Sequence, residues 1–214
     1  STATLNGVVR AMATGAETAT VQFRYSDTNT IDAYGKLNGA NTWDIDADSA
    51  TATGFISTPA VKTLTGLSQG LTYYFQVFST KIVGAQTITS YGDVLSFVTA
   101  AAPAAVTDTA TSVTATSAQL LGNVTANGSE AAVSFCYGKS SAAVDGVLNS
   151  CQTSTSVIAA SPSSTSGTNA AETGTITGLT GGTKYYFQIV AENAMGTVYG
   201  EIRSFTTASD SPTE

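Results

Sequence analysis

Three aspartates at alternate positions are the first residues whose types and spacing could do chemistry. Asp44, Asp46 and Asp48 lie within five consecutive residues. Clustered carboxylate oxygens are the ligands that Ca²⁺ prefers, so this spacing is compatible with a calcium site. An EF-hand loop beginning at Asp44 would need glycine and glutamate where Ser49 and Phe55 stand. The alternative is a strand or loop whose charged side faces water.

The two cysteines of the chain, Cys136 and Cys151, are 15 positions apart. Cys136 follows Phe135 in an alternating segment and should face away from the core, and Cys151 comes about where the neighbouring strand would return. A disulfide that closes a loop of this length would stabilise the fold by about 3 kcal/mol. The alternative is two free thiols, which would suit a cytosolic protein.

The sequence has few of the residues and motifs that enzymes use for catalysis. Histidine is absent, and with it the commonest general base and zinc ligand. Serine–histidine and cysteine–histidine catalysis are therefore excluded. No acid pair, phosphate-binding glycine loop or nucleophile beside a base stands at a meaningful spacing. We expect no enzyme activity and no cofactor, with calcium at the aspartates as the one exception.

The charge balance argues against a nucleic-acid partner. Lys and Arg number 8 against 15 Asp and Glu, which gives a net charge of −7, and no basic stripe is present to neutralise phosphates.

No apolar run approaches the roughly 20 residues that span a bilayer. The first residues do not resemble a signal peptide, so we expect a mature protein or an excerpt of one.

Two asparagines match the glycosylation pattern. They are Asn123, in Asn-Val-Thr, and Asn127, in Asn-Gly-Ser. Patterns of three residues also arise by chance in chains rich in serine and threonine, so the alternative is two unmodified side chains.

A segment of twelve residues occurs twice, at 65–76 and at 177–188, and it organises the rest of the chain. Each copy reads as a turn that leads into a strand, with Gly70 or Gly182 in the turn. Because the side chains of a strand alternate between its faces, one set from each copy should point into a core. These inward residues are Tyr73, Phe75 and Val77 in the first copy, and Tyr185, Phe187 and Ile189 in the second.

The opposite face of each repeated strand is unusually apolar. It carries Tyr74, Gln76 and Phe78 in one copy and Tyr186, Gln188 and Val190 in the other. Aromatic side chains grouped on an exposed sheet often mark a partner contact, which predicts contacts at Tyr74, Phe78, Tyr186 and Val190. The alternative is that long side chains such as Arg24 cover this face.

The repeat indicates two domains in a chain of 214 residues. Thr, Ser, Ala, Gly and Val dominate and long helix-forming runs are missing, which is typical of an all-β protein. We place the units at 1–101 and 102–214. The last hairpin of the first unit, around residues 81–90, is expected to be four residues longer than its counterpart.

These patterns resemble the fibronectin type III family in its bacterial extracellular form. Leu67 and Tyr73, like Leu179 and Tyr185, keep the family's spacing of six, and 193–196 and 205–207 match its Asn-x-x-Gly hairpin and closing Phe-Thr-Thr. The first unit departs from both at 81–84 and 97–99. The resemblance implies two immunoglobulin-like β-sandwiches, each with a tyrosine whose ring lies in the core and whose hydroxyl bonds to nearby backbone.

The first sandwich is expected to lack its own first strand. Residues 2–9 correspond to 117–124, which are the second strands of the two units. The second unit has a plausible first strand at 106–111, but the first unit has only Ser1 and Thr2 before its second strand. Either the chain is cut from a longer array, or another chain supplies the strand. The tail at 208–214 would make a poor donor because it does not alternate and contains a proline.

We therefore expect a structural module, extracellular or on the cell surface, that self-associates as a subunit or repeat of a surface filament, sheath or adhesin. The alternative is a carbohydrate- or protein-binding accessory module of a secreted enzyme, in which exposed Trp43, Tyr34 and Tyr91 would stack on sugar rings.

Overall fold

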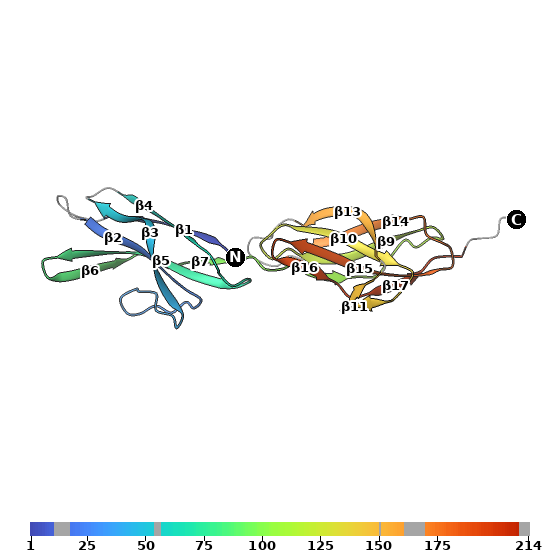
Figure 1. Ribbon diagram of the computed structural model, residues 1–214, viewed down its shortest axis with the longest axis horizontal. Coiled ribbons are helices and arrows are strands. Elements are labelled where there is room, and N and C mark those ends of the chain that lie inside the picture. The colour runs from blue at the N-terminus through green and yellow to red at the C-terminus, as the bar shows by residue number, and fades with distance from the viewer. Residues whose placement is uncertain (11–17, 54–56, 150, 161–169, 210–214) are drawn as a thin grey trace. The chain divides into compact units, whose positions relative to one another are not determined.

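The computed structural model describes residues 1–10, 18–53, 57–149, 151–160 and 170–209. The chain divides into two compact units, Ser1–Thr99 and Ala100–Glu214, so the division falls two residues before the position expected from the sequence. Every regular element in the described ranges is a strand, as expected for an all-β chain (Figure 1). None of the described residues forms a helix that could cross a membrane.

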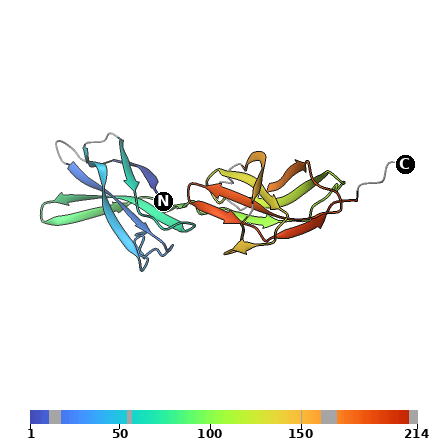
Figure 2. The same cartoon turned by 45° about the vertical axis from the view of Figure 1, so that its right-hand side comes forward.

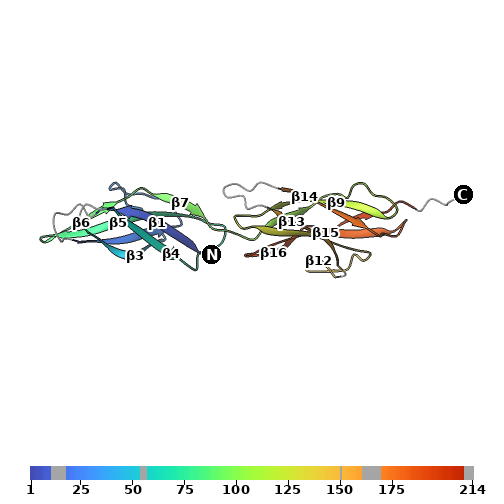
Figure 3. The same cartoon turned by 90° about the horizontal axis from the view of Figure 1, so that it is seen from above.

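Unit 1 is a sandwich of two antiparallel sheets. The smaller sheet pairs β1 (Ala3–Val9) with β4 (Thr58–Leu64), which run side by side in Figure 3. The larger has the order β3-β2-β5-β6, with β7 also paired to β5. Its strands are β2 (Thr18–Ser26), β3 (Thr42–Thr53), β5 (Thr72–Val83), β6 (Gln86–Tyr91) and β7 (Leu95–Val98).

Unit 2 repeats this arrangement, with one more strand in the smaller sheet and a separate two-stranded hairpin. Its smaller sheet has the order β14-β9-β8, and its larger sheet has the order β13-β10-β15-β16, with β17 also paired to β15. The strands are β8 (Ala104–Thr107), β9 (Ser117–Thr125), β10 (Ala131–Gly138), β13 (Gln152–Ala160), β14 (Ala170–Thr177), β15 (Lys184–Asn193), β16 (Gly196–Tyr199) and β17 (Arg203–Thr206). A short hairpin joins β11 (Ala143–Val144) to β12 (Val147–Leu148).

The alternation read from the repeated segment is confirmed. In unit 2 Phe187 and Ile189 are completely buried, and in unit 1 Phe75 and Val77 pack against the core while remaining half-buried. Both tyrosines bond to nearby backbone as the resemblance implied, in the arrangement called a tyrosine corner. The Ser68 N–H donates to the Tyr73 hydroxyl at 3.2 Å, and the Thr180 N–H donates to the Tyr185 hydroxyl at 3.0 Å.

The two differences expected between the units are also present. The β5 and β6 strands are 12 and 6 residues long, against 10 and 4 for β15 and β16. Figure 2 shows this longer hairpin reaching the end of unit 1 away from the N-terminus. The first strand of unit 2 is β8, shorter than expected, with a further bridge between Thr111 and Gln119. Unit 1 has no equivalent of β8 among its described residues.

Candidate functional site

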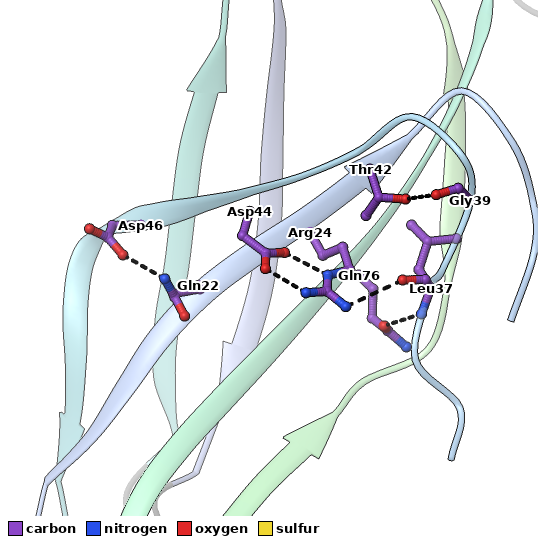
Figure 4. Close-up of polar contacts among 8 residues, drawn as sticks. All are labelled: Gln22, Arg24, Leu37, Gly39, Thr42, Asp44, Asp46 and Gln76. Atoms are coloured by element: carbon purple, nitrogen blue, oxygen red, sulfur yellow. Dashed lines mark hydrogen bonds and ion pairs between the residues drawn. The ribbon is translucent and has the colours of Figure 1, made fainter. Parts of the chain in front are cut away.

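The outer face of the larger sheet in unit 1 is covered by a loop, and a buried glutamine holds that loop in place. Gln76 Oε1 accepts a hydrogen bond from the Leu37 N–H at 3.0 Å, while Gln76 Nε2 donates to the carbonyls of Gly35 at 2.6 Å and Gly92 at 2.7 Å (Figure 4 shows the bond to Leu37). Leu37 is completely buried and Gln76 is 1% exposed. The loop is thus fastened to the middle of β5.

Unit 2 uses the same device at the equivalent positions. Gln188 Oε1 accepts from the Leu148 N–H at 2.8 Å, and its Nε2 donates to the carbonyls of Gly146 and Gly200, both at 3.0 Å. Since a buried amide with its hydrogen-bonding groups paired avoids the cost of desolvation, the repeated glutamine is a structural clamp. The sequence indicated that it was repeated, but not that a loop would fold over it.

The prediction that Phe78 contacts a partner needs correction. Phe78 is 6% exposed, because the Arg24 guanidinium lies 5.5 Å above its ring centroid and the Tyr91 ring packs at 5.8 Å. Long side chains therefore cover this ring, which is the alternative stated above.

The other three residues predicted to contact a partner are half-buried. They are Tyr74, Tyr186 and Val190. The Lys184 ammonium lies 5.2 Å from the ring centroid of Tyr186. Partner contact through these three stays a prediction.

The structure does not gather the three aspartates of the predicted calcium site around one point, because each carboxylate has a different partner. Asp44 accepts two hydrogen bonds from Arg24, one at 2.6 Å from Nε, and these bonds raise the pKa of the arginine. Gln22 Nε2 donates to Asp46 at 2.9 Å (Figure 4). Alternate residues of a strand lie about 7 Å apart, so their carboxylates diverge along β3.

Asp48, the third of these residues, leaves the row altogether. The register between β2 and β3 shifts after Asp46, and Asp48 pairs with Lys62 of β4 at 3.0 Å. No group of three or more acidic, cysteine or histidine side chains suited to a metal occurs in the part of the chain that the structure describes. The aspartates belong to a strand whose charged side faces water.

The disulfide between Cys136 and Cys151 is confirmed. Cys136 lies on β10 and is 1% exposed. Cys136 aligns with Thr153 of β13, so Cys151 precedes the neighbouring strand as the sequence indicated. In unit 1 the equivalent of Cys136 is Arg24, whose bonds to Asp44 of β3 make the corresponding link between strands.

The two candidate glycosylation sites differ in their surroundings. Asn123 is half-buried within β9 and aligns with strand neighbours on both sides. The Asn127 side-chain nitrogen, where a glycan would attach, donates to the Ala102 carbonyl at 2.8 Å. A glycan on Asn127 would have to displace this bond. Glycosylation stays a prediction, and an intact mass equal to that of the polypeptide would contradict it.

The three aromatic residues considered for sugar binding do not form one strip. Trp43 stacks on Tyr25 at 5.1 Å, on the face of β3 that turns toward the core, and it is 45% exposed. Tyr91 packs with Phe78 on the opposite face of the sheet. Tyr34 is 87% exposed in the loop. A flat platform for a sugar chain would need these rings on a single face.

A cleft of about 640 Å³ lies on the surface of unit 2. Its lining includes Tyr137, Asn149 and Tyr185, and its charged member is Lys139, which donates to Thr180 Oγ1 at 3.1 Å. Its cysteine, Cys151, is tied in the disulfide. No carboxylate stands among these lining residues to act as an acid or base. Absence of enzyme activity stays a prediction.

No family model and no curated protein matches the sequence. Solved structures similar to the chain include the sensor domain of the anti-sigma factor RsgI4 from Pseudobacteroides cellulosolvens, at 23% identity and a TM-score of 0.38, covering 50% of this chain and 95% of that one. The FN1-FN3 domains of chicken CNTN1 are 11% identical with a TM-score of 0.38, covering 89% of this chain and 57% of that one.

Proposed function

We propose that the chain is a non-enzymatic extracellular structural module that self-associates as a subunit or repeat of a surface filament, sheath or adhesin. The observation that carries this proposal is the long β5–β6 hairpin of unit 1. Its apolar side chains are exposed: Ile82 at 71%, Val83 at 43% and Ile88 at 53%. Ile82 aligns with Thr87 and Ile88 with Lys81, so the two isoleucines lie on opposite faces of the hairpin. Neither face of the hairpin tip is covered by the core.

Further apolar residues are exposed elsewhere in unit 1. On β7, Leu95 is 55% and Val98 63% exposed, and on β1, Val8 is 63% exposed. Single exposed apolar residues are common, but several of them on one small domain favour a surface that another protein covers. Edge strands such as β6 also present unpaired backbone groups to a second chain.

The disulfide supports an extracellular or surface location, because such bonds persist in oxidising compartments. The outer face of each larger sheet is covered by a loop that a buried glutamine holds by hydrogen bonds, and few residues of the chain are charged. Both features support a structural role rather than catalysis.

Sedimentation velocity and electron microscopy of the purified chain over a range of concentrations test this proposal. We expect ordered assemblies that disappear in the variant Ile82→Lys/Ile88→Lys. The matched control is Val144→Lys, which changes an equally exposed residue on a hairpin of unit 2. A monomer at all concentrations, or equal loss in both variants, contradicts the proposed role of the hairpin.

A further inference from the structure

β6 is the last strand of the larger sheet in unit 1, and no strand in the described part of the chain pairs with its outer edge. The sheet order is β3-β2-β5-β6, and β7 pairs with β5. In unit 2, where the smaller sheet has its third strand β8, the equivalent strand β16 is likewise the last of its sheet. The open edge of β6 is therefore a property of the larger sheet and does not depend on a strand like β8.

The backbone groups of three β6 residues point away from β5. Directly after the strand, the Gly92 N–H donates to the Val77 carbonyl of β5 at 2.9 Å. Successive residues of an antiparallel strand direct their N–H and C=O groups to alternate sides, so Tyr91, Thr89 and Thr87 direct theirs outward. Each of them offers one donor and one acceptor along the free edge.

β6 has none of the features by which edge strands usually avoid pairing, which are charged residues, proline or a bulge. Residues 86–91 read Gln-Thr-Ile-Thr-Ser-Tyr and include no charged residue, proline or glycine. The strand at the opposite end of the same sheet, β3, carries Asp44, Asp46 and Asp48, and its register with β2 shifts. Pairing with a further strand is therefore disfavoured at β3 and favoured at β6.

The outward groups of β6 are complementary to those of a second copy of the same strand. In an antiparallel arrangement about a two-fold axis, Thr89 lies opposite Thr89 of the second copy, and Thr87 lies opposite Tyr91. This register pairs every outward residue of both copies. A shift of two residues in either direction places one outward residue beyond the end of the other strand. The edge therefore favours a single register.

The side chains agree with this register. On the outer face of the sheet, Thr20 of β2 aligns with Thr80 of β5, and Thr80 aligns with Thr89. Pairing Thr89 with its copy continues this row of threonines, and cross-strand threonine pairs are favourable. On the other face, Ile88 is 53% exposed and would lie diagonal to Ile88 of the second copy, about 7 to 8 Å away. A second copy would thus cover an apolar side chain.

We propose that two copies of the chain join edge to edge through β6, so that their larger sheets form one continuous antiparallel sheet about a two-fold axis. The proposal rests on the proposed function, because it names a contact through which copies associate. It adds the partner strand, which is β6 of a second copy, and the register, with Thr89 opposite Thr89.

Two variants that each add one cysteine test the register on the intact chain. Residues opposite each other in a hydrogen-bonded antiparallel pair have Cα atoms about 5.5 Å apart, a distance that a disulfide bridges. Thr89→Cys should therefore form covalent dimers under mild oxidation, seen by non-reducing electrophoresis. Thr87→Cys is the matched control. Its two cysteines would be offset by about 13 Å along the paired strands, so it should form no covalent dimer.

The variant Thr89→Pro tests the hydrogen bonds of the same edge. It removes an outward N–H and leaves the bonds between β6 and β5 in place. In sedimentation velocity its dimer should dissociate at a concentration at least about tenfold higher than that of the parent chain. Thr197→Pro is the matched control, because Thr197 aligns with Glu192 as Thr89 aligns with Thr80. It should associate like the parent chain.

Equal cross-linking of both cysteine variants, or of neither, overturns the proposal. Unchanged association of Thr89→Pro, or an equal loss in Thr197→Pro, also overturns it. If the parent chain still assembles in any of these cases, the proposed function survives and the edge pairing fails. If the parent chain is a monomer at all concentrations, both fail.

Discussion

The buried Gln76 amide gives the sharpest test of how unit 1 holds its outer loop. The variant Gln76→Ala removes three hydrogen bonds, to the Leu37 N–H and to the carbonyls of Gly35 and Gly92. Each such bond contributes about 0.5 to 1.5 kcal/mol net, and a buried group left without a partner costs more. We therefore expect unit 1 to lose about 3 kcal/mol of its free energy of unfolding.

Urea denaturation followed by tryptophan fluorescence measures this loss in unit 1 alone. Trp43 is the one tryptophan of the chain and stacks on Tyr25 at 5.1 Å. With an m-value of about 1.5 kcal/mol/M, the midpoint should fall by about 2 M urea. The matched control is Gln188→Ala, which removes the equivalent bonds in unit 2. It should leave the fluorescence transition in place and lower a second transition seen by circular dichroism.

The clamp role of the Gln76 amide is refuted if Gln76→Ala moves the fluorescence midpoint by less than about 0.5 M urea. That result would mean that the loop is held by the packing of its leucine and not by the amide. It is equally refuted if Gln188→Ala shifts the fluorescence transition as much as Gln76→Ala does, because the clamps would then not act within their own units.

The remaining predictions concern the disulfide, a buried carboxyl and the tyrosine corners. Replacing Cys136 and Cys151 together by alanine should cost unit 2 about 3 kcal/mol in urea denaturation and leave the tryptophan transition unchanged. Burial raises the pKa of Glu172, which is 3% exposed. Its contribution to stability is therefore full below its unfolded pKa of about 4.3 and is lost as the pH rises through the folded value. Glu172→Gln should raise the Tm of unit 2 at pH 7 but not at pH 3, and an equal effect at both would contradict this. Tyr73→Phe and Tyr185→Phe should each cost about 1 kcal/mol in urea denaturation of their own unit, because each loses one hydrogen bond to backbone.

Much of the fold could be read from the sequence because two local signals agreed. The repeated glycine turns and alternating aromatic residues identified β5 and β15, and the spacing of Leu67 to Tyr73 located the tyrosine corner. The cysteine pair was equally readable, since strand spacing alone brings Cys151 beside Cys136. Such features depend on contacts close in the sequence or on a single pair of neighbouring strands.

The outer faces could not be read in this way, because loops far away in the sequence cover them. Alternation assigned Gln76 and Phe78 to the surface, and nothing local indicates that Leu37 would be buried over the same sheet. The partners of the three aspartates on β3 could not be predicted from the sequence for a related reason. Asp44 and Asp46 bond to Arg24 and Gln22 of β2, whereas Asp48, beyond the register shift, pairs with Lys62 of β4.

Arg24 in unit 1 and Cys136 in unit 2 occupy equivalent positions. The two units therefore differ in how a reducing environment affects their stability. Unit 1 ties this position to its neighbouring strand with an ion pair, and unit 2 with a covalent bond. A thiol reductant would break the link in the second unit and leave the ion pair of the first intact. Reduction would therefore weaken one unit of each chain while the other kept its link between strands.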